Sequence, residues 1–403
     1  MSFQQGLSGL NAASKSLEVI GNNVSNASTV GFKQSKTQFA DVYANSLTGG
    51  GASQIGIGTK IAKVQQQFTQ GNITGTNNPL DIAINGGGFF RLSDNGTISY
   101  SRNGQFQLDR EGFIVTNDNK RLTGFVANAA GVLQTGSPTD IWINTADLQP
   151  SASSEVTGLV NLDSRNADLP AAGFNPNDPT TYHNSTSVSI YDSLGNDHTL
   201  QTFFVKTGAG TWDVFTTVDG VTPATALTTM TFTGTGVSPA GATATLSVPV
   251  TTGATTPMSV DLDFSGSTQF GSNFSVNSLV ADGYTSGRLS GFNVGGDGMI
   301  VGRYSNGETA ILGQVVLANF ANPNGLQALG NNAWAETSAS GSPLVGAPNT
   351  GGLGQLQSSA VEDSNVDLTA ELVNMITAQR VYQANAQTIK TQDQVMQTLV
   401  NLR

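Results

Sequence analysis

The last 49 residues of the chain contain neither glycine nor proline, although glycine supplies 48 of the 403 residues. Within this segment, positions at alternating spacings of four and three are mostly apolar or small, which is the heptad pattern of a long amphipathic helix. Ser364, Asn365 and Asp367 precede the pattern and have side chains that cap helices. A helix of ~35 residues would be roughly 50 Å long at about 1.5 Å per residue. The heptad positions are Leu368, Leu372, Met375, Gln379, Tyr382, Ala386, Ile389, Asp393, Met396 and Val400.

The N-terminal segment has the same spacing and predicts a second helix. Burying a side chain of the size of Leu or Ile is worth about 1.5–3 kcal/mol. We therefore expect the two apolar stripes to cover each other, to contact other copies of the chain, or both. The N-terminal stripe consists of Phe3, Gly6, Leu10, Ala13, Leu17, Ile20 and Val24.

A stripe at helical spacing is most often the core-facing side of an ordinary domain helix. The length of the C-terminal segment and its lack of helix breakers favour an extended or intermolecular coiled coil instead. Its other positions carry many amides and hydroxyls, where a freely solvated coiled coil usually carries Glu and Lys. This pattern is typical of a polar but nearly uncharged face in a confined aqueous space.

Between the two helical segments the periodicity changes to two. Residues 187–191, 199–206 and 212–216 alternate and are separated by turn residues, which predicts a three-stranded meander. Asp94-Asn95-Gly96 separates two further apolar runs, and an Asn-Gly step tolerates the positive φ angles of a tight hairpin. The predicted fold class is therefore mainly β with α-helical, coiled-coil-like termini.

Charge distribution indicates nested domains. No Lys or Arg occurs between Lys206 and Arg288, in a stretch rich in Thr, Ser, Gly and Ala. We expect an outer β domain over residues 145–284, inserted into an inner β domain. The other predicted parts are a terminal helical core domain of 1–30 and 359–403, an extended connecting region over 31–70, and the two halves of the inner domain, 71–144 and 285–358.

Composition excludes several kinds of partner. Only 11% of the residues are charged and the net charge is −11, which argues against binding to nucleic acid or to anionic lipid. No apolar run reaches the ~18 residues of a spanning helix, so we expect no membrane insertion. The N-terminus lacks the basic and apolar regions of a cleaved signal peptide, and the chain has no cysteine.

The sequence offers no complete catalytic constellation. His183 and His198 are the only histidines, and neither lies in a nucleophile or metal motif, so we expect them to have a surface or hairpin role. The run 85–89 is rich in glycine but lacks the Lys and Ser/Thr of a phosphate-binding loop. We therefore predict no enzyme activity, no cofactor and no metal site.

Several short motifs in the chain are specific enough to suggest a family. Residues 21–33 read GNNVSNASTVGFK and resemble the N-terminal signature of the bacterial flagellar rod and hook axial proteins. Residues 364–368 and 371–380 resemble the C-terminal signature, and 79–84, 88–90 and 100–106 resemble segments of the inner domain. The length and the large β insertion are most similar to the hook branch of the family. The motif residues singled out in the N-terminal signature are Asn22, Asn23, Asn26, Gly31 and Phe32.

The resemblance implies a structural subunit that polymerises into a curved, flexible tube, which acts as a universal joint and transmits torque from the motor rod to the filament. It implies that the terminal helices pack around a central channel, and that the subunit is exported by the flagellar type III apparatus without a cleaved signal. The implied partners are other copies of the chain, rod proteins, the hook cap and hook–filament junction proteins, in the extracellular hook and basal body. The residues expected to mediate self-assembly are Phe3, Leu10, Leu17, Ile20, Val24, Leu368, Leu372, Met375, Tyr382, Ile389, Met396 and Val400.

Two alternatives stay open at this point. A distal-rod protein of the same family would share the terminal motifs but would form a straight, rigid tube. A surface adhesin or a phage-tail-like β protein would explain the centre rich in Thr, Gly and Asn, but not the paired terminal heptads.

Overall fold

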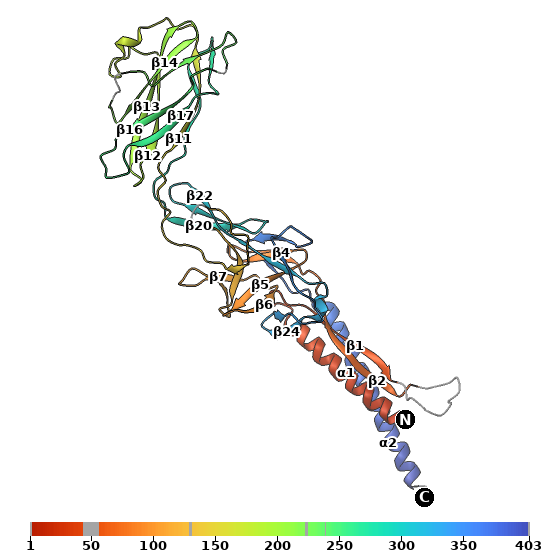
Figure 1. Cartoon of the computed structure of the whole chain (residues 1–403). Coiled ribbons are helices and arrows are strands. Elements are labelled where there is room, and N and C mark those ends of the chain that lie inside the picture. Colours follow the sequence, from red (N-terminus) through yellow and green to blue (C-terminus); the bar gives the residue numbers. More distant parts are fainter. Residues whose placement is uncertain (1, 43–55, 129–130, 222–224, 238, 402–403) are drawn as a thin grey trace. The chain divides into compact units, whose positions relative to one another are not determined.

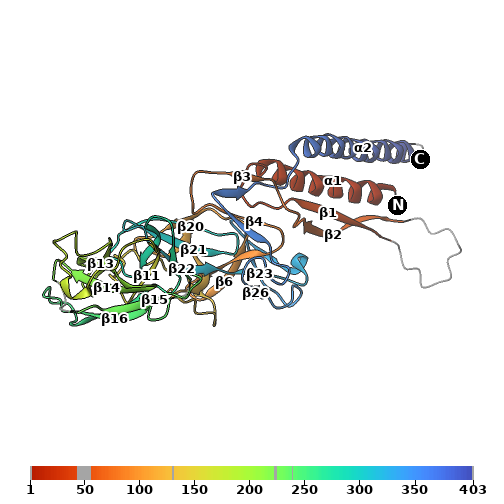
Figure 2. The same cartoon turned by 90° about the horizontal axis from the view of Figure 1, so that it is seen from above.

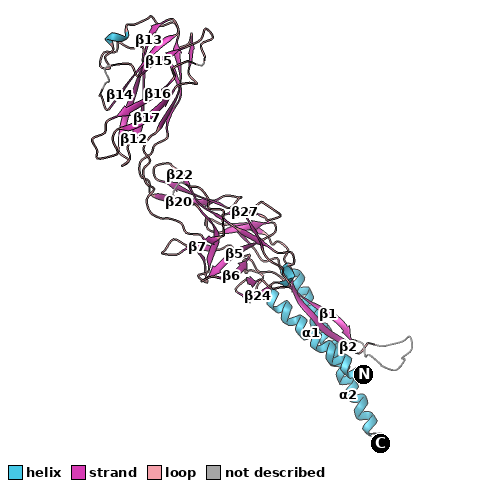
Figure 3. Ribbon diagram, in the orientation of Figure 1, coloured by secondary structure: helices cyan, strands magenta, loops and turns pink. Residues whose placement is uncertain are grey.

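The computed structural model describes residues 2–42, 56–128, 131–221, 225–237 and 239–401. In these residues, α-helices occur only near the two chain ends and strands make up most of the remaining regular structure (Figure 1; Figure 3). The predicted mainly β fold with helical termini is confirmed.

The chain divides into two compact units. Unit 1 comprises Met1–Asn144, Phe292–Gly302 and Ala310–Arg403, and unit 2 comprises Thr145–Gly291 and Arg303–Thr309. Unit 2 is thus inserted into unit 1, as expected for nested domains. The finer borders at residues 30, 70 and 358 stay a prediction.

Two long helices, α1 (Ser2–Ser25) and α2 (Leu368–Asn401), belong to unit 1. The Asp367 carboxylate accepts hydrogen bonds from the backbone N–H groups of Thr369 and Ala370, at 2.9 and 3.1 Å. This bonding satisfies donors that the first turn of a helix leaves free, and it confirms the predicted cap. Neither described helix combines the length and the apolar character that crossing a bilayer requires.

Part of the expected connecting region 31–70 forms a hairpin of β1 (Ser35–Val42) and β2 (Gly58–Gln66). The two strands pair antiparallel, with Gln38 opposite Lys63 and Phe39 opposite Ile61. Ala62 is therefore an extra residue in β2. Such a bulge breaks the period of two along the strand, which is why the sequence pattern did not reveal the pairing.

The β-structure of unit 1 surrounds an aromatic core. Phe89, Tyr100, Phe320 and Trp334 are buried together and pack edge to face. The predicted hairpin at Asp94-Asn95-Gly96 is confirmed, because β5 and β6 pair across it and Asn95 and Gly96 have φ angles of 49° and 93°. The other strands of unit 1 are β3 (Ile73–Gly75), β4 (Ile82–Asn85), β5 (Phe89–Asp94), β6 (Thr97–Ser101), β7 (Phe106–Leu108), β8 (Ile114–Thr116), β9 (Arg121–Val126), β10 (Thr139–Asp140), β20 (Leu289–Val294), β21 (Met299–Tyr304), β22 (Thr309–Val315), β23 (Leu317–Asn319), β24 (Gln327–Gly330), β25 (Ala333–Ala335), β26 (Leu344–Gly346), β27 (Gln355–Ser358) and β28 (Ala360–Glu362), and a 3₁₀ turn covers Pro323–Gly325. Of these, β20, β21 and β22 also include residues of unit 2.

Unit 2 consists of two sheets that share one core. One sheet has the strand order β12-β13-β14-β15 and contains the predicted meander, and the other has the order β16-β17-β11-β18 with β19 paired to β11. Trp212, Phe204 and Phe264 are fully or almost fully buried between them. The elements are β11 (Glu155–Asp163), β12 (Asn184–Tyr191), β13 (Asp197–Gly208), β14 (Thr211–Val218), β15 (Thr228–Thr231), β16 (Thr243–Val248), β17 (Met258–Asp263), β18 (Thr268–Phe270), β19 (Ser275–Ala281) and a 3₁₀ turn at Ala171–Gly173.

Two carboxylates flank His198 near the turn that joins β12 to β13. The His198 Nδ1 lies 2.7 Å from Asp219 Oδ2, and its Nε2 lies 3.5 Å from Asp192 Oδ2. The hydrogen bond to Asp219 raises the pKa of His198 above its ordinary value, although burial acts in the opposite direction. The expected hairpin role therefore applies to His198, which is buried rather than on the surface.

We expect the stability of the β12–β14 meander to fall as the pH rises above 6.5, the ordinary pKa of His198. Because the pKa of His198 is raised from 6.5 on folding, its stabilising effect is complete below the unfolded pKa and is lost as the pH rises through the folded pKa. Hydrogen exchange of residues 184–218, corrected for intrinsic rates, measures this loss. His198→Gln should flatten the dependence, and an unchanged slope in that variant would contradict the assignment.

Candidate self-assembly site

The two terminal helices pack against each other in an antiparallel arrangement. A Cβ atom on Gly6 would lie 3.1 Å from Ile389 Cγ1, and one on Gly9 would lie 2.6 Å from the Asn385 side chain. At the other end of α1, Gln34 Nε2 donates to Glu371 Oε1 at 2.6 Å. The two glycines therefore let the helices approach closely where their backbones would otherwise be held apart by side chains.

Helix α1 lies between α2 and the β1–β2 hairpin (Figure 2). A groove with a volume of about 940 Å³ runs beside α1, bounded by α2 and by residues of the hairpin. Its lining includes several small side chains, among them Ala12, Ser16 and Ala378, and also Glu371. We call this surface the α1 groove.

Among the residues that the structure describes, the antiparallel register leaves the end of α2 without a partner helix. Only four residues of α1 precede Gly6, whereas twelve residues of α2 follow Ile389. Helix α2 therefore projects ~12 Å beyond the start of α1, at about 1.5 Å per residue, and its C-terminal end extends past the N-terminus (Figure 1). We call residues 394–401 the α2 overhang. Met396 and Val400 in it are 60% and 71% exposed.

The predicted self-assembly residues are divided between covered and exposed positions. Ile20 is buried, and Leu10, Leu17, Val24, Met375 and Ile389 are half-buried. The side chains that stay exposed in the single chain are Phe3, Leu368, Leu372, Tyr382, Met396 and Val400. Their role in self-assembly stays a prediction.

The face of α2 that is shielded within the chain is rotated from the predicted heptad seam. The shielded positions are Glu371, Met375, Ala378, Asn385, Ala386, Ile389 and Gln392, and only some of these belong to the predicted stripe. The hydrogen bond between Gln34 and Glu371 and the close approaches at Gly6 and Gly9 all lie on this shielded face. Leu368 and Leu372 consequently lie beside the contact with α1 instead of within it.

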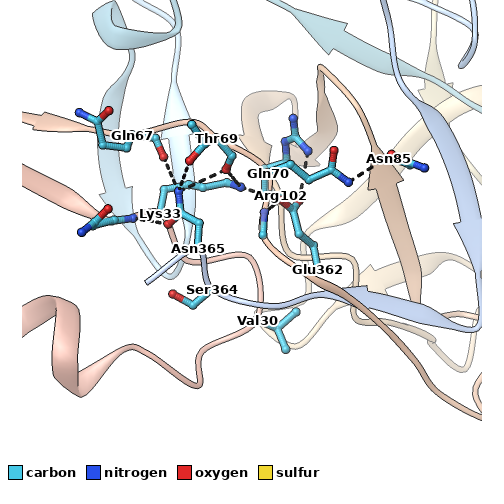
Figure 4. Close-up of polar contacts among 12 residues, drawn as sticks. Val30, Lys33, Gln67, Thr69, Gln70, Asn85, Arg102, Glu362, Ser364 and Asn365 are labelled. Atoms are coloured by element: carbon cyan, nitrogen blue, oxygen red, sulfur yellow. Dashed lines mark hydrogen bonds and ion pairs between the residues drawn. The ribbon is translucent and has the colours of Figure 1, made fainter. Parts of the chain in front are cut away.

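A buried carboxylate joins both ends of the chain to the inner β-structure (Figure 4). Glu362, at the end of β28, accepts hydrogen bonds from Lys33 Nζ at 2.7 Å, from Arg102 Nη1 at 3.1 Å and from the backbone N–H of Gly71 at 2.9 Å. The side chains of Lys33 and Glu362 have no exposed surface, and that of Arg102 is 5% exposed. We call Lys33, Arg102 and Glu362 the junction cluster.

Each cation of the junction cluster has a second acceptor. Lys33 Nζ also donates to the carbonyl of Thr69, and Arg102 Nη2 donates to the carbonyl of Gly86, both at 2.8 Å. Burial lowers the pKa of Lys33 and of Arg102, and in both cases the charge of Glu362 opposes this effect. The cluster therefore depends on one carboxylate to offset the desolvation of two cations.

The family-motif residues form the turn that leads from α1 into this cluster. Gly31 has a φ of +71° and its N–H donates to the carbonyl of Glu362, and a Cβ atom there would lie 2.6 Å from the backbone nitrogen of Asn103. Only glycine fits such a position. Phe32 is buried next to it in the sequence.

The three motif asparagines have different roles at the end of α1. Buried Asn23 exchanges two hydrogen bonds with the backbone of Ser35, at 2.8 and 2.9 Å, and so fixes the start of β1. The Asn26 side chain donates to the carbonyl of Asn22 at 3.0 Å, which also accepts a hydrogen bond from the backbone N–H of Asn26 at 3.1 Å.

Asn365 ties the start of α2 to the same turn. Its Nδ2 donates to the carbonyl of Gln67 at 2.8 Å, and its Oδ1 accepts from the backbone N–H of Gln34 at 2.7 Å (Figure 4). No group of three or more potential metal-ligating side chains occurs in the part of the chain that the structure describes. The site therefore consists of apolar contact surfaces and a polar junction.

Comparison with known proteins places the chain in a family. Family models match it as "Flagella basal body rod protein" over residues 3–33, "Flagellar hook protein FlgE/F/G D1 domain" over 83–158, "Flagellar basal body protein FlaE D2 domain" over 161–284 and "Flagellar basal body rod FlgEFG protein C-terminal" over 357–402. The flagellar hook protein FlgE of Salmonella typhimurium is 43% identical over 413 residues, which cover all of both chains. The chain belongs to the flagellar hook protein FlgE family.

More distant members agree with this assignment. The flagellar hook protein FlgE of Escherichia coli is 42% identical over 414 residues, and that of Borreliella burgdorferi is 32% identical over 441 residues, with full coverage of this chain in both cases. The crystal structure of Helicobacter pylori flagellar hook protein FlgE2 has a TM-score of 0.54 at 15% identity and covers 72% of this chain and 100% of its own. That likeness supports the fold.

Sequence reasoning missed the central acid of the junction cluster. Lys33 and Arg102 lie within quoted family motifs, but Glu362 lies outside them and has no periodic or capping pattern. The available signal was the presence of a Lys and an Arg in weakly charged segments. If such cations are buried, each requires a nearby acid, and this requirement would have predicted a buried carboxylate.

Glu362→Gln should destabilise the junction strongly. The variant leaves Lys33 and Arg102 buried without their carboxylate, which we expect to cost about 3–5 kcal/mol. Hydrogen exchange of residues 27–35 and 355–365 measures the change. Glu18→Gln is the matched control, since it removes the exposed pair with Lys15 at 55% and 58% side-chain exposure, worth about 0–1 kcal/mol. Equal effects of the two variants would refute the role of Glu362.

Proposed function

We propose that the chain is a structural subunit of the bacterial flagellar hook, which polymerises through its terminal helices into a curved, flexible tube. In this function the tube is a universal joint that transmits torque from the motor rod to the filament. The full-length relatives carry the hook name, which supports the hook rather than the distal rod as the site of assembly.

The exposed apolar surface of α2 is the observation that carries this proposal. Many exposed large apolar side chains on one element of a folded chain are typical of an interaction site. On α2 they are 38–71% exposed: Leu368, Leu372, Val373, Ile376, Val381, Tyr382, Val395, Met396 and Val400. Covering each of the larger side chains is worth about 1.5–3 kcal/mol, so association of many copies gains free energy at both ends of the helix.

The proposed location and partners follow from membership of the family. The subunit belongs in the extracellular hook and basal body, with rod proteins, the hook cap and the hook–filament junction proteins as its neighbours. Export through the flagellar type III apparatus requires an unfolded chain, and a chain without cysteine cannot be trapped by disulfides during this passage.

Bending of the proposed tube requires contacts that slide. The outward positions of β16 in unit 2 are Thr243, Thr245 and Ser247, and contacts between short, uncharged side chains are individually weak. Disulfide cross-links introduced between unit 2 of neighbouring subunits should therefore stiffen the polymer. Electron micrographs measure its curvature, and unaltered bending would argue against sliding at this surface.

Leu372→Asp should block polymerisation without unfolding the chain. Leu372 is 44% exposed, so the single chain tolerates the change, whereas the tube would bury the new charge. The concentration needed for assembly should rise at least about tenfold, from the apolar burial that is lost. Sedimentation and electron microscopy detect the polymer, and circular dichroism detects the helices.

Gln383→Asp is the control on the same helix, because Gln383 is exposed and polar. Normal assembly of Leu372→Asp, or equal loss in both variants, would count against the proposed interface. Straight tubes formed by the unaltered chain would indicate a distal-rod protein instead of a hook subunit.

A further inference from the structure

We propose that the α2 overhang of one subunit inserts into the α1 groove of a second copy, which links subunits head to tail. The inference rests on the proposed function and specifies which surfaces of the terminal helices meet. It is drawn from the unequal lengths to which the two helices extend and from the groove beside α1, which the described residues leave open.

The overhang continues a face that is already used for helix packing. Ile389 contacts α1 at Gly6, and Met396 and Val400 follow it at spacings of seven and four. Residues at these spacings lie on one face of a helix. The face that α1 covers up to its own N-terminus therefore runs on uncovered into the overhang.

The overhang cannot fill the groove of its own chain. Helix α2 is continuous to Asn401, and the groove lies beside α1 from Gln5 to Asn23, so it begins near the point where Gly6 meets Ile389 and runs toward the start of α2. The overhang points away from that region. Only another molecule can bring this surface to the groove.

The small side chains that line the groove leave room for a helix end that carries large apolar side chains. Small side chains of both helices, including Ala12, Ala13, Ser16 and Ala378, line a volume of about 940 Å³. Large side chains pack well against small ones at close helix contacts. The overhang supplies Met396 and Val400 on one face, with the amides of Gln394 and Gln397 beside them.

One carboxylate oxygen in the wall of the groove has no hydrogen-bond donor among the described residues. Glu371 lines it and is 3% exposed, yet its Oε2 accepts no hydrogen bond. A buried carboxylate oxygen without a donor is costly. Insertion of a polar helix edge into the groove provides amide donors at this wall.

This contact has the symmetry of an open polymer. The overhang and the groove are different surfaces of the same unit, so the contact is heterologous, and a row of subunits keeps a free overhang at one end and a free groove at the other. Repetition of the contact generates a filament instead of a closed dimer.

The absence of cysteine allows a direct cross-linking test. One population of full-length chain carries Met396→Cys, or Gln397→Cys at the next position, and a second carries Ser8→Cys or Ser16→Cys, both of which line the groove. Ser14→Cys is the matched control, because Ser14 does not line the groove. The two populations are mixed, assembled, oxidised and examined for covalent dimers.

We expect dimers with the groove cysteines in polymer, at a yield several-fold above that with Ser14→Cys, and none in unassembled protein, because a disulfide needs Cα atoms within about 7 Å. Polymer that forms without these dimers, or with equal yields for Ser14→Cys, overturns the insertion and leaves the proposed function intact. Failure of the unaltered chain to polymerise overturns the proposed function, and the insertion with it.

Discussion

The arrangement of unit 1 depends on the ion pairs that the buried carboxylate of Glu362 makes with Lys33 and Arg102. Lys33 belongs to the turn after α1, and Arg102 belongs to the inner β-structure. Glu362 ends β28, shortly before α2 begins at Leu368. Three segments far apart in the sequence are thereby fixed at one point. The direction in which each helix leaves this point follows from the turn at Gly31 and from the hydrogen bonds of Asn23 and Asn365.

From that fixed point the two helices run side by side but not to the same length. Close packing at Gly6 and Gly9 holds α1 against α2, and the greater length of α2 leaves its last turns bare. The rotation of α2 turns Leu368 and Leu372 out of the contact with α1. A single chain thus covers part of the apolar surface of its helices and leaves the rest exposed to solvent. A subunit that assembles needs such an uncovered apolar surface.

Local signals in the sequence were sufficient for the fold class and for several elements. Asp367 marks the start of α2, Asn95-Gly96 marks a hairpin, and the change from heptads to alternation separates helices from strands. Long-range polar contacts were not predictable, because nothing local distinguishes Glu362 from an exposed acid. The bulge at Ala62 and the rotation of α2 depend on which surfaces meet in three dimensions, so periodicity alone did not show which face of α2 contacts α1.

The ion pair between Lys33 and Glu362 spans 329 positions of the chain. A contact this distant closes slowly, since the entropy of a long loop must be overcome before the contact forms. Unit 2 is nearly contiguous and needs no such closure. Unit 2 is therefore able to fold before α1 meets α2, and the helical end of the molecule forms only when the last residues of the chain are available. The order of the sequence itself delays premature association.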